Sequence, residues 1–166
     1  SYAALGVRAQ HARVLSLSHS NPALLGGVEE AKRRAILLAR EDDLTGLLNR
    51  RGFVEVIRER LASSTQASLV AVFDVDGFKL VNEGFGHATG DVVLASMAAR
   101  LCASLPRTVP VARLGGDEFA ILVQADDGEQ AAAVGEAAVA ACTGTVQGGG
   151  RWVPMRVRGG AAGPGS

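Results

Sequence analysis

The stretch Val111-Ala-Arg-Leu-Gly-Gly-Asp-Glu-Phe-Ala-Ile-Leu-Val123 decides the fold that the rest of the sequence is expected to adopt. Two short apolar runs flank its centre, Gly115-Gly-Asp-Glu118. A Gly-Gly pair between apolar runs predicts a tight β-hairpin, because both central residues of a type I′ turn need a positive φ. Asp117 and Glu118 would lie at the rim of this hairpin, where carboxylates either hold a cation or face water. Both interpretations stay open on this stretch alone.

A second acidic strand end lies earlier in the chain. Ser68-Leu-Val-Ala-Val-Phe-Asp-Val-Asp76 is apolar on both faces, as in a central strand that is covered on both sides. The two-residue period of a strand puts Asp74 and Asp76 on the same side. If this strand lies beside the hairpin, Asp74 and Asp117 converge at one end of the sheet, and Asp76 or Glu118 lies nearby. Carboxylates without His or Cys suit Mg²⁺, so the pattern predicts magnesium-dependent nucleotidyl transfer.

The residues after this strand offer groups for a nucleotide. Residues 77–91 are predicted to form a Gly-rich loop with a short helical turn, followed by a helix from Asp91 to Leu105. Gly77-Phe-Lys79 can supply backbone N–H groups and one cation to a triphosphate. Asn82 and Asp91 offer an amide and a carboxylate, which can read the edges of a guanine. An ordinary structural role is also open to each of these residues: Asn82 as a turn residue, Asp91 as a helix cap and Lys79 as a solvated cation.

The order of the predicted elements sets the fold class. Helices are expected over residues 50–63, 91–105 and 129–141, and a further strand over 152–157. With the central strand and the hairpin, this order predicts an α+β sandwich with a mainly antiparallel sheet flanked by helices. The length of 166 residues fits one domain with a short appendage.

The amino-acid composition limits the classes of binding partner that we expect. The 17 basic and 17 acidic residues cancel, so we expect neither nucleic acid nor an anionic membrane as a partner. Cys102 and Cys142 fall in helical segments without metal-ligand spacing, which predicts buried, reduced thiols. Reduced thiols and the lack of a signal-peptide pattern favour a cytoplasmic location.

Residues 1–41 are predicted to form a helical segment ahead of the domain. A helix over Tyr2–Leu17 is followed by a break near Asn21-Pro22, because a residue before proline disfavours helix. Val28–Arg40 then shows an amphipathic pattern. This helix is either a coiled-coil signalling linker or a helix packed on the domain.

Taken together, these motifs resemble the GGDEF family, the diguanylate cyclases. Three stretches carry the resemblance in the family's order: Asp43-Leu-Thr-Gly-Leu-Leu-Asn-Arg-Arg-Gly-Phe53, Phe73-Asp-Val-Asp-Gly-Phe-Lys-Leu-Val-Asn-Glu-Gly-Phe-Gly-His-Ala-Thr-Gly-Asp91 and Ala112-Arg-Leu-Gly-Gly-Asp-Glu-Phe119. The resemblance implies a fold like the nucleotidyl cyclase and polymerase palm domains over residues 42–166.

The resemblance also implies a reaction and a site. Two GTP molecules, one on each protomer of a homodimer, would be joined into cyclic di-GMP with release of pyrophosphate. By matching position, Asp74, the backbone carbonyl of Val75 and Asp117 would hold Mg²⁺ or Mn²⁺. Asp117 or Glu118 would help to deprotonate the 3′-hydroxyl. The implied substrate-binding positions are Asn82, His87, Asp91, Gly77, Phe78 and Lys79. An upstream sensor domain would supply the input signal.

Three departures from the family pattern qualify the expected function. The family's inhibitory product site, Arg-x-x-Asp, is replaced by Pro106-Arg-Thr-Val109, so we expect no tight product complex there, which calorimetry can test. The segment Arg156–Ala162 aligns with the penultimate strand but is unusual in composition. The family's last helix is absent, so we expect a C-terminally truncated domain. The alternative function is a catalytically impaired GTP-binding, regulatory or dimerisation module.

Overall fold

The computed structural model describes residues 22–162 of the chain. Backbone contacts divide the chain into two compact units, with the boundary between Leu37 and Leu38. The first unit contains all but the last residue of helix α2 (Pro22–Leu38), which begins at Pro22 rather than at the predicted Val28. A proline suits the first turn of a helix, because an N–H group there has no intrahelical partner. The helix predicted over residues 2–17 lies outside the described residues.

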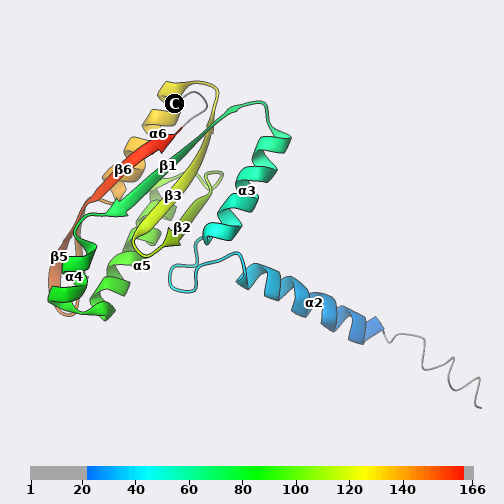
Figure 1. Ribbon diagram of the computed structural model, residues 1–166, viewed down its shortest axis with the longest axis horizontal. Coiled ribbons are helices and arrows are strands. Elements are labelled where there is room, and N and C mark those ends of the chain that lie inside the picture. The colour runs from blue at the N-terminus through cyan, green and yellow to red at the C-terminus, as the bar shows by residue number, and fades with distance from the viewer. Residues whose placement is uncertain (1–21, 163–166) are drawn as a thin grey trace, which may run out of the picture. The chain divides into compact units, whose positions relative to one another are not determined.

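The second unit is built on a four-stranded antiparallel sheet in the order β2-β3-β1-β6 (Figure 1). Its strands are β1 (Ala67–Val75), β2 (Val111–Gly115), β3 (Glu118–Ala125) and β6 (Val157–Ala162). A separate antiparallel hairpin consists of β4 (Gly144–Gly148) and β5 (Arg151–Met155). The predicted antiparallel α+β fold is confirmed. The strand predicted over residues 152–157 is instead divided at Arg156 between the two sheets.

Helices cover both faces of the larger sheet (Figure 1). The helices of this unit are α3 (Arg50–Ser63), α4 (Phe78–Phe85), α5 (His87–Ser104) and α6 (Gly128–Ala141). The side chain of Asn49 caps α3 and accepts a hydrogen bond of 2.9 Å from the Gly52 N–H group. Asp127 caps α6 in the same way.

The alternation of β1 explains why its sequence is apolar at successive positions. Val70 and Val72 pack with Phe53 of α3 on one face of the sheet. Ala71 and Phe73 belong to the larger core on the other face, together with buried residues of α5 and α6. A central strand covered on both sides was predicted, and the structure confirms it.

The region after β1 is more helical than predicted. Residues 78–85 form α4, and α5 begins at His87 rather than at Asp91. Two glycines in this region adopt a positive φ: Gly77 at 71° before α4 and Gly86 at 87° between the two helices. The other glycines here lie within helices, so a Gly-rich composition was misleading as evidence for a loop. Asp91 is therefore one turn inside α5, not its N-cap.

The two cysteines differ in environment. Cys142 is buried, and burial raises the pKa of its thiol to about 12. Cys102 is exposed, so the prediction of a buried thiol there was wrong. Its neighbour Leu101 occupies the buried face of α5, and the next residue along a helix points away from that face. Within residues 22–162, no helix is long and apolar enough to span a lipid bilayer.

Candidate functional site

The end of β1 and the start of β3 bring two predicted acids together. Asp74 pairs directly with Glu118 across the antiparallel ladder. Directly paired residues of antiparallel strands project from the same face of the sheet, with Cβ atoms about 4.5–5.5 Å apart. Asp74 is exposed and makes no hydrogen bond or ion pair within the part of the chain that the structure describes. Its carboxylate is therefore free to accept a ligand.

The hairpin turn brings Asp117 to the same place. β2 ends at Gly115 and β3 begins at Glu118, so Gly116 and Asp117 are the central turn residues. Gly116 has a φ of 53°, whereas Asp117 has no positive φ, which is the φ pattern of a type II′ turn. The predicted type I′ turn centred on the two glycines is wrong, because a bulge before Gly115 shifts the register of the pair. The Val75 N–H group donates to the Asp117 carbonyl at 3.3 Å, which joins the turn to β1.

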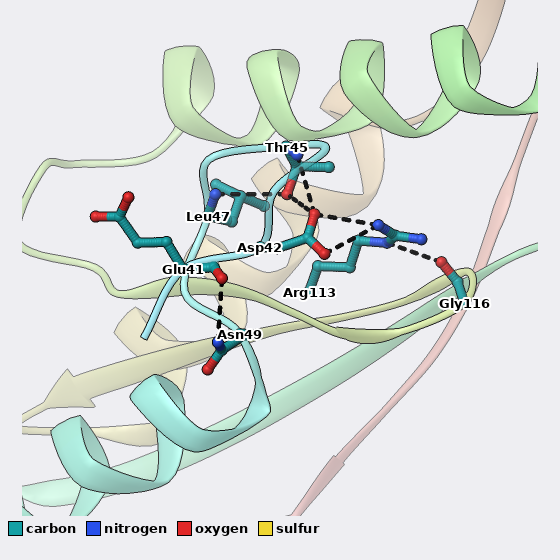
Figure 2. Close-up of polar contacts among 7 residues, drawn as sticks. All are labelled: Glu41, Asp42, Thr45, Leu47, Asn49, Arg113 and Gly116. Atoms are coloured by element: carbon teal, nitrogen blue, oxygen red, sulfur yellow. Dashed lines mark hydrogen bonds and ion pairs between the residues drawn. The ribbon is translucent and has the colours of Figure 1, made fainter. Parts of the chain in front are cut away.

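A partly buried arginine, Arg113, makes hydrogen bonds to this turn and to the loop that begins at Asp42 (Figure 2). Arg113 Nη1 donates to both carboxylate oxygens of Asp42, at 3.1 and 3.0 Å. Arg113 Nε donates to the Gly116 carbonyl at 2.8 Å. Asp42 also accepts hydrogen bonds from the backbone and hydroxyl groups of Thr45, at 2.9 and 2.6 Å. The guanidinium therefore connects the Asp42–Thr45 loop to the residue that precedes Asp117.

The environment of Asp42 favours its charged form. The Asp42 and Arg113 side chains are only 20% and 14% exposed. Burial by itself would raise the pKa of Asp42, but hydrogen bonds from Thr45 and Arg113 and the charge of Arg113 outweigh it. The net result is a pKa below the ordinary value, so the carboxylate is fully ionised near neutrality and the link to the turn is intact there.

Asn82 of α4 packs closely against Gly90 of α5. The Asn82 Oδ1 atom is buried and has no hydrogen-bond partner among the described residues. A Cβ atom on Gly90 would lie 1.9 Å from this oxygen, so the present position of the Asn82 amide requires glycine at residue 90. Asp91, the next residue, is exposed. A buried, unpartnered amide oxygen is costly unless a ligand supplies the missing donor, and the adjacent carboxylate offers a second acceptor.

The remaining predicted substrate residues lie along α4 and at the start of α5. Gly77 precedes α4, and Phe78 and Lys79 are its first residues, directly after the acidic end of β1. The Lys79 side chain is 86% exposed and lies 3.7 Å from Glu83. His87 is the exposed first residue of α5 and makes no hydrogen bond or ion pair to another residue between 22 and 162. The structure thus brings the acids together but leaves Lys79 and His87 on the outside.

Two further arginines lie beside the acids, and the sequence reasoning assigned no role to either. Arg50 Nη2 lies 3.4 Å from Glu118 Oε2. Arg158 of β6 makes an ion pair with Asp76. The hydrogen bond from Arg158 lowers the pKa of Asp76 below its ordinary range. Both contacts depend on strand and helix placement across the fold, so no local sequence pattern could have indicated them.

The predicted metal ligands are chemically suited to a hard cation. Asp74, the Val75 carbonyl and Asp117 are all oxygen donors, which Mg²⁺ prefers, and they would leave positions for water and phosphate oxygens. This set contains two carboxylates and one backbone group. Within residues 22–162, no cluster of three or more His, Cys, Asp or Glu side chains is arranged around a metal position.

Known proteins resemble this chain in sequence and in fold. The sequence profile described as "Diguanylate cyclase, GGDEF domain" matches residues 39–162. The bifunctional diguanylate cyclase/cyclic di-GMP phosphodiesterase MucR of Pseudomonas aeruginosa is 37% identical over 120 residues, covering 68% of this chain and 17% of MucR. Diguanylate cyclase DgcP of the same organism is 35% identical over 136 residues, covering 78% of this chain and 20% of DgcP. The chain therefore spans a fifth or less of the length of these relatives.

A solved structure agrees with the sequence matches. An N-terminally shortened form of YfiN from Pseudomonas aeruginosa, comprising only its GGDEF domain, superposes with a TM-score of 0.71 at 32% identity. The superposition covers 75% of this chain and 76% of that domain. The similarity thus extends over most of the described second unit.

Proposed function

The chain belongs to the family of diguanylate cyclase GGDEF domains, and on this premise we propose that it condenses two GTP molecules into cyclic di-GMP. Mg²⁺ is the proposed cofactor, with Mn²⁺ as a substitute. In each half-reaction the 3′-hydroxyl oxygen of one GTP forms a bond to the α-phosphorus of the other. The bond from that phosphorus to the β-phosphate oxygen breaks, and pyrophosphate leaves. Two such steps close the ring.

The metal is assigned to the end of β1 and the hairpin turn. Asp74, the Val75 carbonyl and Asp117 would hold it, and the bound ion would neutralise phosphate charge and activate the attacking hydroxyl. The observation that carries this proposal is the unpaired Asp74 carboxylate lying directly across from Glu118. A free carboxylate can take a ligand at once, whereas an ion-paired one must first lose its partner.

Asp117 and Glu118 are the candidates for accepting the proton of the 3′-hydroxyl. The Glu118 carboxylate already lies 3.4 Å from Arg50, so it has a partner that a proton would have to displace. Asp117 makes no side-chain hydrogen bond or ion pair among the described residues, but the proposed metal would occupy its carboxylate. Both acids are therefore kept as candidates for this role.

The region around Asn82 and Asp91, where α4 packs against α5, is the proposed guanine site. Asn82 Oδ1 would accept a hydrogen bond from a guanine N–H group, and the Asp91 carboxylate would accept another. Gly77, Phe78 and the cation of Lys79 would lie beside the phosphates. His87 is assigned a secondary contact near the base. An adenine presents a different donor and acceptor pattern, so this arrangement predicts selection of GTP over ATP.

The reaction needs two protomers, because each holds one GTP and therefore half of the product. We propose a homodimer for the active form and an upstream sensor domain in the full-length protein that controls its assembly. We further propose that residues 1–41 act as a helical signalling segment ahead of the catalytic domain at 42–166. A cytoplasmic location is proposed from the substrate, since GTP is available there.

The test is product formation from GTP and Mg²⁺, followed by chromatography and mass spectrometry. The wild-type chain is expected to form cyclic di-GMP, and Asp117→Ala is expected to form none. Asp126→Ala is the matched control, because Asp126 follows the opposite end of β3 and its one side-chain hydrogen bond among the described residues is to Gln66. Loss of activity in both variants would point to a general effect on folding and would contradict the assignment of Asp117.

The same measurement, combined with a GTP-binding assay, distinguishes a cyclase from the alternative function. Mg²⁺-dependent GTP binding without product in the wild type would favour a regulatory or dimerisation module over a cyclase. No binding of Mg²⁺·GTP at all would contradict both proposals.

A further inference from the structure

Arg158 lies in the row of charged residues that crosses the sheet at its acidic end. β6 pairs with β1 so that Arg158 is directly opposite Asp74, and Asp74 is in turn directly opposite Glu118. Residues paired in this way project from the same face, with neighbouring Cβ atoms about 4.5–5.5 Å apart. A long, flexible arginine at this position can therefore reach a group that is held at the Asp74 carboxylate.

The guanidinium of Arg158 is largely unused. Its side chain is 73% exposed, and among the described residues it makes one hydrogen bond, to the Asp76 carboxylate. A guanidinium has five N–H donors, so most of its donors face water. Arg113, by contrast, is 14% exposed and has its donors committed to Asp42 and Gly116. Arg113 is built into the fold, whereas Arg158 is available for another partner.

The present partner of Arg158 is easily exchanged. An ion pair between solvent-exposed groups is weak, because water and salt compete with it and two side chains lose freedom. A phosphate group offers a guanidinium two parallel hydrogen bonds and a higher charge than one carboxylate does. A nucleotide phosphate near Asp74 would therefore compete successfully with Asp76.

We propose that Arg158 is a phosphate-binding residue of this site, which exchanges the Asp76 carboxylate for phosphate oxygens when Mg²⁺·GTP binds. This assignment rests on the proposed function, because it requires GTP at the acidic end of the sheet. Arg158 contacts the β- and γ-phosphates rather than the α-phosphate, which is attached to the ribose. Its contribution to binding affinity therefore depends on how many phosphates the ligand carries. It places a cation on the β6 side of the phosphates, opposite the hairpin that carries Asp117.

The experiment is calorimetric binding of guanosine 5′-(α,β-methylene)triphosphate, which cannot form product, and of GMP, both with Mg²⁺. Loss of charge-assisted hydrogen bonds predicts that Arg158→Ala weakens binding of the triphosphate roughly ten- to hundredfold. Binding of GMP should change less than about twofold, since it lacks the outer phosphates. Arg158→Lys keeps the charge but loses the planar fork, so it should give an intermediate affinity.

Arg51→Ala is the matched control. Arg51 is 72% exposed and pairs with a carboxylate that is 34% exposed, compared with 73% and 34% for Arg158 and Asp76. Removing it changes the net charge equally, but its partner is Glu55 of α3 rather than an acid of the row, so triphosphate affinity should be unchanged. Circular dichroism and thermal unfolding would verify that each variant is folded.

Two results would overturn the assignment of Arg158. Unchanged triphosphate affinity in Arg158→Ala would mean that the residue does not contact phosphate. Tighter triphosphate binding, with half-saturation at lower Mg²⁺, would mean that Arg158 instead competes with the metal for the carboxylates. Failure of the proposed function is a separate outcome, seen in the wild-type chain itself: it would bind neither GMP nor the triphosphate, or it would bind GTP without forming product.

Discussion

Replacing Gly90 with alanine probes the close contact between α4 and α5 at Asn82. An alanine Cβ atom would lie 1.9 Å from Asn82 Oδ1 and 3.2 Å from Phe78 Cζ. Carbon–oxygen contacts normally begin near about 3.3 Å, so the oxygen would have to move by more than about 1 Å. Asn82 is short and its backbone is fixed in α4, so its amide must rotate away from residue 90 or the two helices must separate.

The expected effect on stability is small, because two terms oppose each other. Alanine is favoured over glycine in a helix by about 0.8–1 kcal/mol. Crowding a packed interior costs about 1–3 kcal/mol. We therefore expect the free energy of unfolding of Gly90→Ala to fall by about 2 kcal/mol at most. This loss leaves most of the protein folded at room temperature if the domain has ordinary stability.

We expect Gly90→Ala to have a larger effect on nucleotide affinity, relative to the wild type, than on stability. If the Asn82 amide makes two hydrogen bonds to guanine, displacing it removes about 0.5–1.5 kcal/mol for each. The affinity for Mg²⁺·GTP should then fall by a factor of roughly 5–150, and the preference for GTP over ATP should fall with it. Displacement of the amide does not affect contacts to the phosphates, so the residual binding should discriminate poorly between the two bases.

The assay is calorimetric titration with non-hydrolysable analogues of GTP and ATP, together with urea denaturation. Gly135→Ala in α6 is the matched control, since no atom lies within 4 Å of the position that its new methyl group would occupy. It should stabilise the protein by about 0.5–1 kcal/mol and leave binding unchanged. The reasoning is refuted if Gly90→Ala binds GTP as tightly and as selectively as the wild type.

Three other predictions concern the rest of the fold. Asp42→Asn should lower the free energy of unfolding at neutral pH by about 2 kcal/mol, from lost charge-assisted hydrogen bonds. Because the pKa of Asp42 is lowered by folding, its contribution is present above the ordinary value of 3.8 and is lost as pH falls below it. Urea denaturation at a series of pH values should therefore show the wild type and variant converging in acid, and parallel curves would contradict this. Iodoacetamide at neutral pH should modify Cys102 but not Cys142 in the folded chain. Mass spectrometry of peptides would identify the modified residue, and modification of Cys142 with Cys102 unmodified would contradict the prediction. Gly159→Ala should destabilise the domain by about 1–3 kcal/mol, because its Cβ atom would lie 2.8 Å from Phe73 Cδ1; an unchanged thermal midpoint would exclude that close contact.

The features that could be predicted from sequence are those with a local cause. The central strand was predictable because β-branched and apolar residues run together in Ser68–Phe73 and acids end the run. Asn49 was predictable as a helix cap because its side chain acts on an amide three residues away. The pairing of Asp74 with the hairpin was predicted conditionally, and the strand register confirms it.

The features that could not be predicted depend on residues that are distant in sequence. Arg113 forms an ion pair with Asp42, and this contact exists only once the two segments that carry these residues have packed together. Glycine composition misled the prediction for residues 77–91, since a buried glycine between packed helices and a glycine in a loop look the same in sequence. Gly90 is required by the proximity of Asn82, a tertiary contact between helices. The roles of the candidate site residues remain predictions.

The unbroken pairing of β1 with β3 has a consequence for changes in chain length. Eight successive residue pairs join these strands, from Ala67–Ala125 to Asp74–Glu118. Because side chains alternate between faces, one extra residue inside β3 would turn either its core residues outward or Glu118 away from Asp74. The turn at residues 148–150 carries no such constraint from this ladder. Insertion scanning should therefore find that single-residue insertions in β3 abolish nucleotide binding, whereas many substitutions at exposed positions are tolerated.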